Sequence, residues 1–333
     1  MIAYSELSIW LLVCLLIVGL VLLCYGGDWL ARGAASFAIN WKINPIVVGL
    51  TVVAVATSMP ELIAGFFAAG QGLDGLVVGN IVGSNLGNIG LILGVAALIY
   101  PIRIQSRMIR QEMPILLAVT LLFTFMGIGL AGGPGVISRI DSIILLAGTV
   151  CYVGFVVHQA IRLRHTAAEE AVDELAEPIR SQWVCGGLVF AGSLGLAAGA
   201  DFLVGSSSQI ATRLGVSDGL IGLTVVAIGT SLPELAASIA AALRRHSDII
   251  VGNIVGSNIF NMLLIGGGVG VVYPIKVDAA FYRIEYPAMV LSTVILWVVL
   301  FTKRQIDRTE GAVFLLLYAL ILGLATLSQQ GKL

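Results

Sequence analysis

Two glutamates lie well inside long apolar stretches of this chain, Glu61 within residues 44–69 and Glu234 within residues 217–243. A carboxylate at such a depth in a membrane span is costly unless a partner compensates its charge. No Lys or Arg lies in the apolar middle of any expected span, so the alternative of an ion-paired structural role lacks a partner. Two copies in the same context therefore indicate ligands for a cation that enters from solution.

Hydroxyl groups and a proline accompany each glutamate. Thr57 and Ser58 precede Glu61 by four and three residues, so in a helix the three side chains share one face. Pro60 cannot donate the helical hydrogen bond, so it bends the helix and lets nearby carbonyls, including that of Ala54, turn toward an ion. The second stretch repeats this arrangement with Thr230, Ser231, Pro233 and Glu234.

Two further apolar stretches supply more oxygen atoms. Ser84 and Asn88 are four residues apart, as are Ser257 and Asn261, so each pair shares a helix face. Because the set contains only oxygen donors and no Cys or His, it suits sodium or calcium better than zinc or copper. One calcium or two sodium ions would neutralise the two carboxylates, and their mutually exclusive binding is a physical basis for exchange. Helix–helix hydrogen bonding is the alternative role for the two serines.

Other polar residues have structural interpretations. Helix packing is favoured over direct ligation for four asparagines, Asn80, Asn85, Asn253 and Asn258. Capping or local pairing is expected for Asp28 and Asp201, which lie toward the ends of their spans. Glu112 and Glu285 are expected to be first-turn acids that interact with the helix dipole.

The composition places these residues in a membrane protein. Of 333 residues, 58% are hydrophobic and 11% are charged, against roughly 25% charged in soluble domains. That excludes a soluble globular enzyme, and a net charge of −1 offers no basic surface to nucleic acid. Since about 20 residues cross a bilayer, the apolar runs predict ten spans, near 7–30, 44–69, 75–99, 112–130, 139–160, 182–206, 217–243, 248–272, 285–302 and 310–328.

The distribution of Lys and Arg predicts the orientation. With the N-terminus outside, 13 of the 18 Lys and Arg residues fall on the inside, as the positive-inside rule requires. We therefore expect both termini outside. The longest polar stretch, 161–181, is expected to be a cytoplasmic connector.

The chain contains an internal repeat of one long sequence unit. Residues 49–101 match residues 222–274 without a gap, at an offset of 173 residues. GLTVVAVATSMPEL in the first copy corresponds to GLTVVAIGTSLPEL in the second, and VGNIVGSN occurs in both. Five spans in each unit is an odd number, so the second unit must be inverted in the membrane, as in many secondary transporters. The predicted fold is an all-α polytopic membrane protein with ten transmembrane helices in two inverted five-helix repeats, 1–160 and 182–333, joined by 161–181.

At these residues the sequence resembles the sodium/calcium exchangers of the calcium/cation antiporter superfamily, in their compact prokaryotic form. The segments GTSLPE and GNIVGSN, in two halves, look like that family's paired alpha-repeats. The resemblance implies a core of spans 2, 3, 7 and 8, across which slanted spans 1 and 6 slide during alternating access. It implies sodium and calcium ligands at Ala54, Thr57, Ser58, Glu61, Ser84, Asn88, Ala227, Thr230, Ser231, Glu234, Ser257 and Asn261.

The resemblance therefore implies a sodium-driven calcium antiporter and not an enzyme. Its partners would be calcium ions, sodium ions and the lipid bilayer, with no cofactor, no nucleic acid and no obligatory protein partner. Some relatives, including potassium-dependent branches, have Asp at the place of Asn261, which weakens a potassium-coupled interpretation here. The first copy also reads VATS where the second has the more typical IGTS.

Two alternatives stay open. The first is a proton-coupled antiporter for calcium or another divalent cation, although that branch typically carries an extra acid where this chain reads GNIVGSN. The second is a cation channel, against which the inverted repeat argues. The lack of a large regulatory loop and of a transit peptide favours a prokaryotic cytoplasmic membrane.

Overall fold

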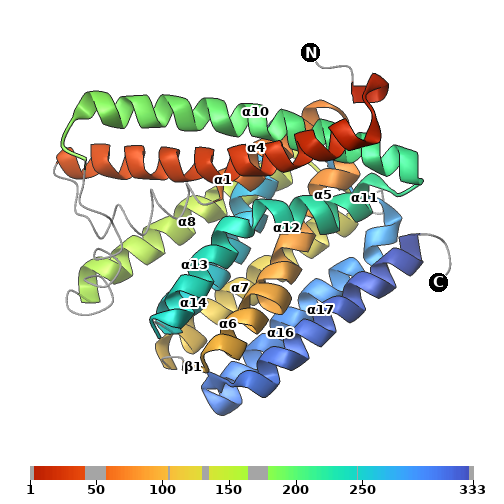
Figure 1. The fold of residues 1–333 in the computed structure, drawn as a ribbon. Coiled ribbons are helices and arrows are strands. Elements are labelled where there is room, and N and C mark those ends of the chain that lie inside the picture. The colour runs from red at the N-terminus through yellow and green to blue at the C-terminus, as the bar shows by residue number, and fades with distance from the viewer. Residues whose placement is uncertain are drawn as a thin grey trace.

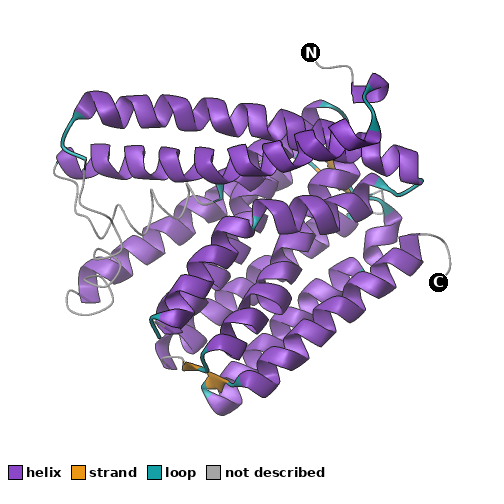
Figure 2. Ribbon diagram, in the orientation of Figure 1, coloured by secondary structure: helices purple, strands orange, loops and turns teal. Residues whose placement is uncertain are grey.

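The computed structural model describes residues 4–41, 58–103, 106–129, 135–163, 179–245 and 247–329. These residues are almost wholly helical, with four two-residue strands (Figure 2). Among them, eight helices are long and apolar enough to cross a membrane, and a bent pair, Asp218–Thr230 with Leu232–Leu243, makes nine. The expected span 44–69 is described only from Ser58 onward. The all-helical membrane architecture is confirmed, whereas a count of ten rests partly on residues outside the described ranges.

The elements follow the chain in two series. The first half holds η1 (Tyr4–Glu6), α1 (Ile9–Asn40), α4 (Met59–Gly70), α5 (Asp74–Gly87), the π-helical η3 (Asn88–Ile92), α6 (Leu93–Ile99), β1 (Ile102–Arg103), α7 (Ser106–Ile128), β2 (Val136–Ile137) and α8 (Arg139–Leu163). The second half holds α10 (Gln182–Leu214), α11 (Asp218–Ile221), the π-helical η4 (Gly222–Val226), α12 (Ala227–Thr230), α13 (Leu232–Leu243), α14 (Ser247–Phe260), the π-helical η5 (Asn261–Gly266), α15 (Gly267–Val272), β3 (Ile275–Lys276), η6 (Ala279–Tyr282), α16 (Glu285–Lys303), β4 (Gln305–Ile306) and α17 (Arg308–Gln329).

Two helices run past the ends expected from the sequence. We expected the first span to end near residue 30, but α1 continues to Asn40, and we expected the sixth to end near 206, but α10 continues to Leu214. The charges that suggested the first boundary, Asp28 and Arg32, pair with each other at 2.8 Å across one helical turn. Because such a pair satisfies both charges within the helix, it does not end the helix.

Helices α1 and α10 lie side by side along one face of the molecule (Figure 1). Their contact is antiparallel and is lined by glycines seven residues apart in each helix. A Cβ added at Gly19 would lie 2.9 Å from the carbonyl oxygen of Gly199, and one at Gly26 would lie 2.9 Å from that of Gly192. The offset of 173 residues relates Gly19 to Gly192 and Gly26 to Gly199, so the two close contacts are equivalent under exchange of the halves.

The two halves also interlock at two further contacts. Helix α17 packs on η3 and α6 of the first half, and α8 packs on η5 and α15 of the second. An added Cβ at Gly94 would lie 3.0 Å from the carbonyl oxygen of Gly311, and at the equivalent Gly267 it would lie 3.0 Å from that of Ser142. The strands also pair between the halves, since β1 and β2 of the first half pair with β4 and β3 of the second half, respectively. Each half therefore completes the packing of the other.

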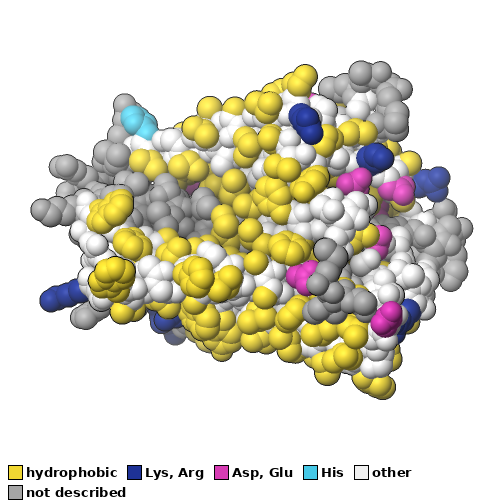
Figure 3. All heavy atoms as spheres, turned by 90° about the horizontal axis from the view of Figure 1, so that it is seen from above, with side chains coloured by type: hydrophobic (Ala, Val, Ile, Leu, Met, Phe, Trp, Pro, Cys, Tyr) yellow, Lys and Arg dark blue, Asp and Glu magenta, His cyan; other side chains and the backbone are white. Residues whose placement is uncertain are grey.

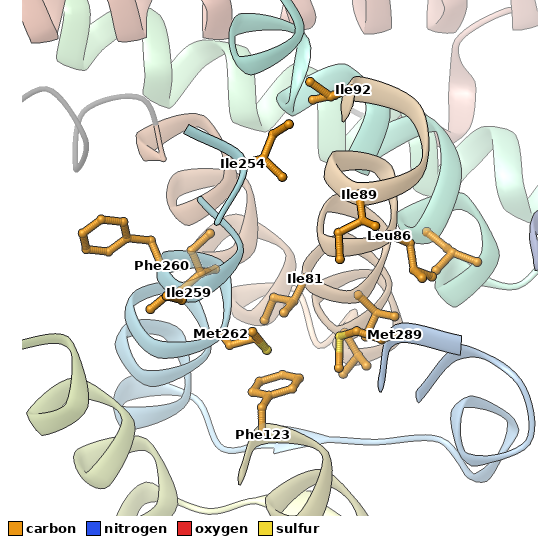
Figure 4. Close-up of a cluster of buried hydrophobic side chains, with 14 of the residues drawn as sticks. Ile81, Leu86, Ile89, Ile92, Phe123, Ile254, Ile259, Phe260, Met262 and Met289 are labelled. Atoms are coloured by element: carbon orange, nitrogen blue, oxygen red, sulfur yellow. The ribbon is translucent and has the colours of Figure 1, made fainter. Parts of the chain in front are cut away.

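Burial separates central helices from peripheral ones. The most buried candidate spans are Asp74–Ile99 and Ile249–Val272. Of the 18 most apolar consecutive residues in each, 83% and 72% are buried, against 22% for Ile9–Phe37. Between them, Ile81, Phe123, Met262 and Met289 converge in an apolar cluster (Figure 4). On the face in Figure 3, hydrophobic side chains far outnumber charged ones among the described residues, and most of the charged ones lie toward its left and right ends. This is the distribution that a surrounding bilayer favours.

Candidate cation site

Both glutamates of interest lie in the first turn of a helix. Helix α4 begins at Met59, just before Glu61, and α13 begins at Leu232, just before Glu234. In the second half the chain bends by 45° at this break, because Pro233 cannot continue the backbone hydrogen bonding of the preceding helix. The sequence predicted the bend but placed each glutamate inside one long helix. A helix N-terminus carries partial positive charge, so it favours the carboxylates found there.

The two carboxylates are buried and come close to each other. Glu61 is 1% exposed and Glu234 is 3% exposed, and their charges are near enough to interact. No ion pair joins a basic side chain to either one among the described residues. Two buried like charges repel, so a site of this kind requires a bound cation or proton.

Hydroxyl groups from both halves meet at Glu61. The Ser231 hydroxyl lies 3.3 Å from Oε1 of Glu61 and 3.2 Å from the Ser84 hydroxyl. Thr230, fully buried, lies 3.3 Å from Oδ1 of Asn80 and 3.0 Å from the carbonyl oxygen of Val226. Residues 170 positions apart in the chain are thereby brought into one polar cluster.

Three acceptor oxygens of the predicted ligand set have no hydrogen-bond partner among the described residues. They are Oε2 of Glu61, Oε2 of Glu234 and Oδ1 of Asn88, and all three are buried. An unsatisfied buried acceptor is costly, and an unsatisfied buried carboxylate oxygen more so. Oxygen atoms of this kind are the ligand atoms that sodium and calcium prefer.

The asparagines of the two central helices occupy equivalent and unusual positions. Asn88 is the first residue of η3, and Asn261 is the first residue of η5. In both places the α-helix widens into a π-helical stretch, a feature that is frequent at functional sites. Periodicity in the sequence did not predict these stretches, although the exact repetition of GNIVGSN before each one marks the place.

The other predicted ligands divide into three groups. Ser58, Ser257 and Asn261 are buried within α4, α14 and η5 or at their ends. Ala227 is buried and its carbonyl accepts the backbone N–H of Ser231 at 3.1 Å. Ala54 and Thr57 lie outside the described residues.

The close approach of α5 to η4 and α12 positions this cluster. Gly83 precedes Ser84, and a Cβ added to it would lie 2.7 Å from the Cβ of Ala227 and would overlap the carbonyl oxygen of Leu223. Only glycine permits the two backbones to come so near. The contact holds the Ser84 side chain within hydrogen-bond distance of Ser231.

Acids outside the cluster have local partners. Asp28 pairs with Arg32 on the exposed face of α1, and Asp201 accepts a hydrogen bond of 2.9 Å from the Tyr4 hydroxyl. The pairing of Asp28 lies within one helical turn, as expected, whereas Asp201 bonds to a side chain 197 positions earlier in the chain. Glu112 is not at the start of its helix as expected, because α7 begins at Ser106.

Comparisons with known proteins agree with the fold and with the internal repeat. The family described as "Sodium/calcium exchanger protein" matches residues 11–159 and again residues 185–327. The sodium/calcium exchanger MaX1 of Methanosarcina acetivorans is 32% identical, over 92% of this chain and 96% of that protein. The Ca(2+)/H(+) antiporter ChaA of Bacillus subtilis is 27% identical, over 87% and 86%. A solved structure of the sodium-calcium exchanger NCX_Mj has a TM-score of 0.64 at 29% identity, over 95% of this chain and 99% of that one.

Proposed function

The chain belongs to the sodium/calcium exchanger protein family, and on that premise we propose that it exchanges sodium for calcium across a membrane by alternating access. The observation that carries the proposal is the pair of buried carboxylate oxygens, one each from Glu61 and Glu234, that have no hydrogen-bond partner among the described residues. One calcium ion or two sodium ions would neutralise this pair, so occupancy by one species excludes the other. The family consists of transporters, so no catalytic residue is proposed.

We propose that the ions bind to the oxygens of the predicted set. Glu61, Ser84 and Ser231 are supported by their burial and by the contacts among them. Asn88 and Glu234 are supported by their burial and by an oxygen without a hydrogen-bond partner among the described residues. Calcium takes 6–8 oxygen ligands, and more are proposed at Ala54, Thr57, Ser58, Ala227, Thr230, Ser257 and Asn261. No cofactor is proposed.

The proposed architecture is ten spans in two inverted repeats, 1–160 and 182–333, joined by a cytoplasmic connector at 161–181. The equivalent glycine contacts between α1 and α10 support it, as does the reciprocal packing of α8 and α17. The excess of Lys and Arg on one side supports both termini outside, in a prokaryotic cytoplasmic membrane.

Proton coupling is the second candidate function, and the similarity to a Ca(2+)/H(+) antiporter is the observation that favours it. Two buried carboxylates can also take up protons in place of a metal ion. The two proposals differ in which gradient drives calcium movement, so transport measurements separate them.

We expect sodium-loaded proteoliposomes to accumulate radioactive calcium after dilution into sodium-free buffer with equal potassium and pH on both sides. Potassium and protons are equal on both sides, so the outward sodium gradient is the only counter-ion gradient that can drive calcium above its external concentration. Liposomes loaded with choline instead of sodium are the control. Uptake that ignores sodium and follows an imposed pH difference would establish proton coupling instead. Calcium entry that follows a membrane potential without any counter-ion gradient would indicate a channel.

A further inference from the structure

Three buried asparagines form a series of hydrogen bonds between the two central helices, Asn88 and Asn258 through their side chains and Asn85 through its backbone carbonyl. The Nδ2 group of Asn88 donates to Oδ1 of Asn258 at 2.9 Å. The Nδ2 group of Asn258 donates in turn to the backbone carbonyl of Asn85 at 3.4 Å. Each of the three side chains is 1% exposed, so water does not compete for these groups.

The backbone carbonyl of Asn85 determines the orientation of the side-chain amides of Asn258 and Asn88. A backbone carbonyl can only accept a hydrogen bond, so Asn258 must present its NH2 group to Asn85. The oxygen of Asn258 then faces Asn88, and Asn88 must present its own NH2 group to it. The remaining atom, Oδ1 of Asn88, is the buried oxygen without a hydrogen-bond partner among the described residues. A flip of the Asn88 amide would bring two oxygens together and lose the bond.

We propose that Asn258 is a positioning residue, which presents the oxygen of Asn88 rather than its NH2 group to the transported ion. The inference rests on the proposed function, in which Asn88 is a ligand. An NH2 group facing a cation would repel it, whereas a carbonyl-type oxygen is a good calcium ligand. Partners that orient ligands in this way are worth roughly 10–100-fold in metal affinity.

The equivalent residue of the first half is differently engaged. Asn85 corresponds to Asn258 at the offset of 173 residues, but its Nδ2 group donates at 2.7 Å to the carbonyl of Ile81 in its own helix. Its Oδ1 accepts no hydrogen bond from the described residues. Asn85 thus has the same side chain and burial without an amide to orient, which makes it a matched control.

The first test is calcium binding to purified protein, measured by isothermal titration calorimetry. Asn258→Leu keeps the branched shape and the number of side-chain heavy atoms but removes the acceptor, so we expect calcium affinity to fall by roughly tenfold. Asn85→Leu should stay within about twofold of wild type. Its side chain bonds only to Ile81 of its own helix among the described residues, and the substitution keeps the backbone carbonyl that accepts from Asn258. Thermal unfolding without ions should show both variants folded.

A double-mutant cycle separates orientation from packing. In an Asn88→Asp background, the carboxylate presents an oxygen in either orientation, so Asn258 has nothing left to orient. There we expect Asn258→Leu to leave calcium affinity within about twofold or to raise it, because it also removes the contact between Oδ1 of Asn258 and a carboxylate oxygen; in the wild-type background it should lower the affinity by roughly tenfold. A structural role that does not act through Asn88, such as the bond of Asn258 to the carbonyl of Asn85, would cost the same in both backgrounds.

Three results would overturn the proposal: an unchanged calcium affinity in Asn258→Leu, an equal loss in Asn85→Leu, or an equal loss in the two backgrounds. Failure of the proposed function has a different signature. In that case wild-type protein binds no calcium, and Glu61→Gln changes nothing. If wild type binds calcium and Glu61→Gln does not, the cation site stands, and the result at Asn258 is decided on its own.

Discussion

Sodium-dependent calcium uptake is expected to disappear in Glu61→Gln and in Glu234→Gln. Glutamine keeps the size of the side chain and one oxygen, but it removes a full negative charge from a site without a counter-charge among the described residues. The remaining carboxylate cannot neutralise a divalent ion alone. Because these are proposed direct ligands, the loss should exceed the roughly 10–100-fold that an outer partner costs.

Although calcium uptake should be lost in Glu61→Gln and Glu234→Gln, the stability of the ion-free protein should not fall in either variant. Each substitution relieves the repulsion between two buried carboxylates, so the unfolding temperature without ions should stay equal or rise. Calcium raises the unfolding temperature of a protein only if it binds the folded state more tightly than the unfolded state, and that rise should vanish in both variants. Ion-free stability and ligand-induced stability therefore separate a lost site from a lost fold.

The matched control is Glu310→Gln, which makes the same chemical change at the start of α17. Glu310 pairs with Lys303 at the end of the membrane-spanning region, away from the carboxylate cluster. Uptake in this variant should equal that of wild type. Sodium-dependent uptake that persists in either Glu61→Gln or Glu234→Gln would remove that carboxylate from the proposed exchange site.

The repeated pattern made the centre of the molecule predictable. A carboxylate that is surrounded by apolar residues in both repeats of a membrane protein indicates a functional role. The structure buries Glu61 and Glu234 as expected. The helix ends were less predictable, because a charge marks the edge of a bilayer only when it lacks a partner. Asp28 and Arg32 neutralise each other within α1, and the helix passes through them.

The amide network could not be predicted from the sequence. GNIVGSN shows that asparagines recur, but the side-chain bond from Asn88 to Asn258 joins residues 170 positions apart. Periodicity reports which face of a helix is apolar, and it contains no information on the direction of an amide. The widening of the helix at Asn88 and Asn261 is equally hidden, because a π-helical turn changes the register by one residue without a compositional signal.

The close packing of Gly83 next to the carboxylate cluster makes stability and calcium affinity sensitive to a substitution there. Gly83→Ala should lower the free energy of unfolding by about 3 kcal/mol, at the upper end of the usual cost of overpacking. The added Cβ would meet the backbone of Leu223 and the Cβ of Ala227, and neither can move without displacing η4 and α12. That displacement would stretch the 3.2 Å contact between Ser84 and Ser231, so calcium affinity should fall along with stability.

Gly87→Ala in the same helix is the control for this prediction. A Cβ at Gly87 would lie 3.7 Å from the Tyr318 hydroxyl, an ordinary van der Waals contact. Alanine is a better helix former than glycine by about 0.5–1 kcal/mol, so this variant should be as stable as wild type or slightly more stable. Thermal unfolding and calcium titration of the two variants decide the matter. Equal behaviour of both would mean that α5 and η4 are not held at the distance of closest backbone approach, and that the geometry of Ser84 does not depend on Gly83.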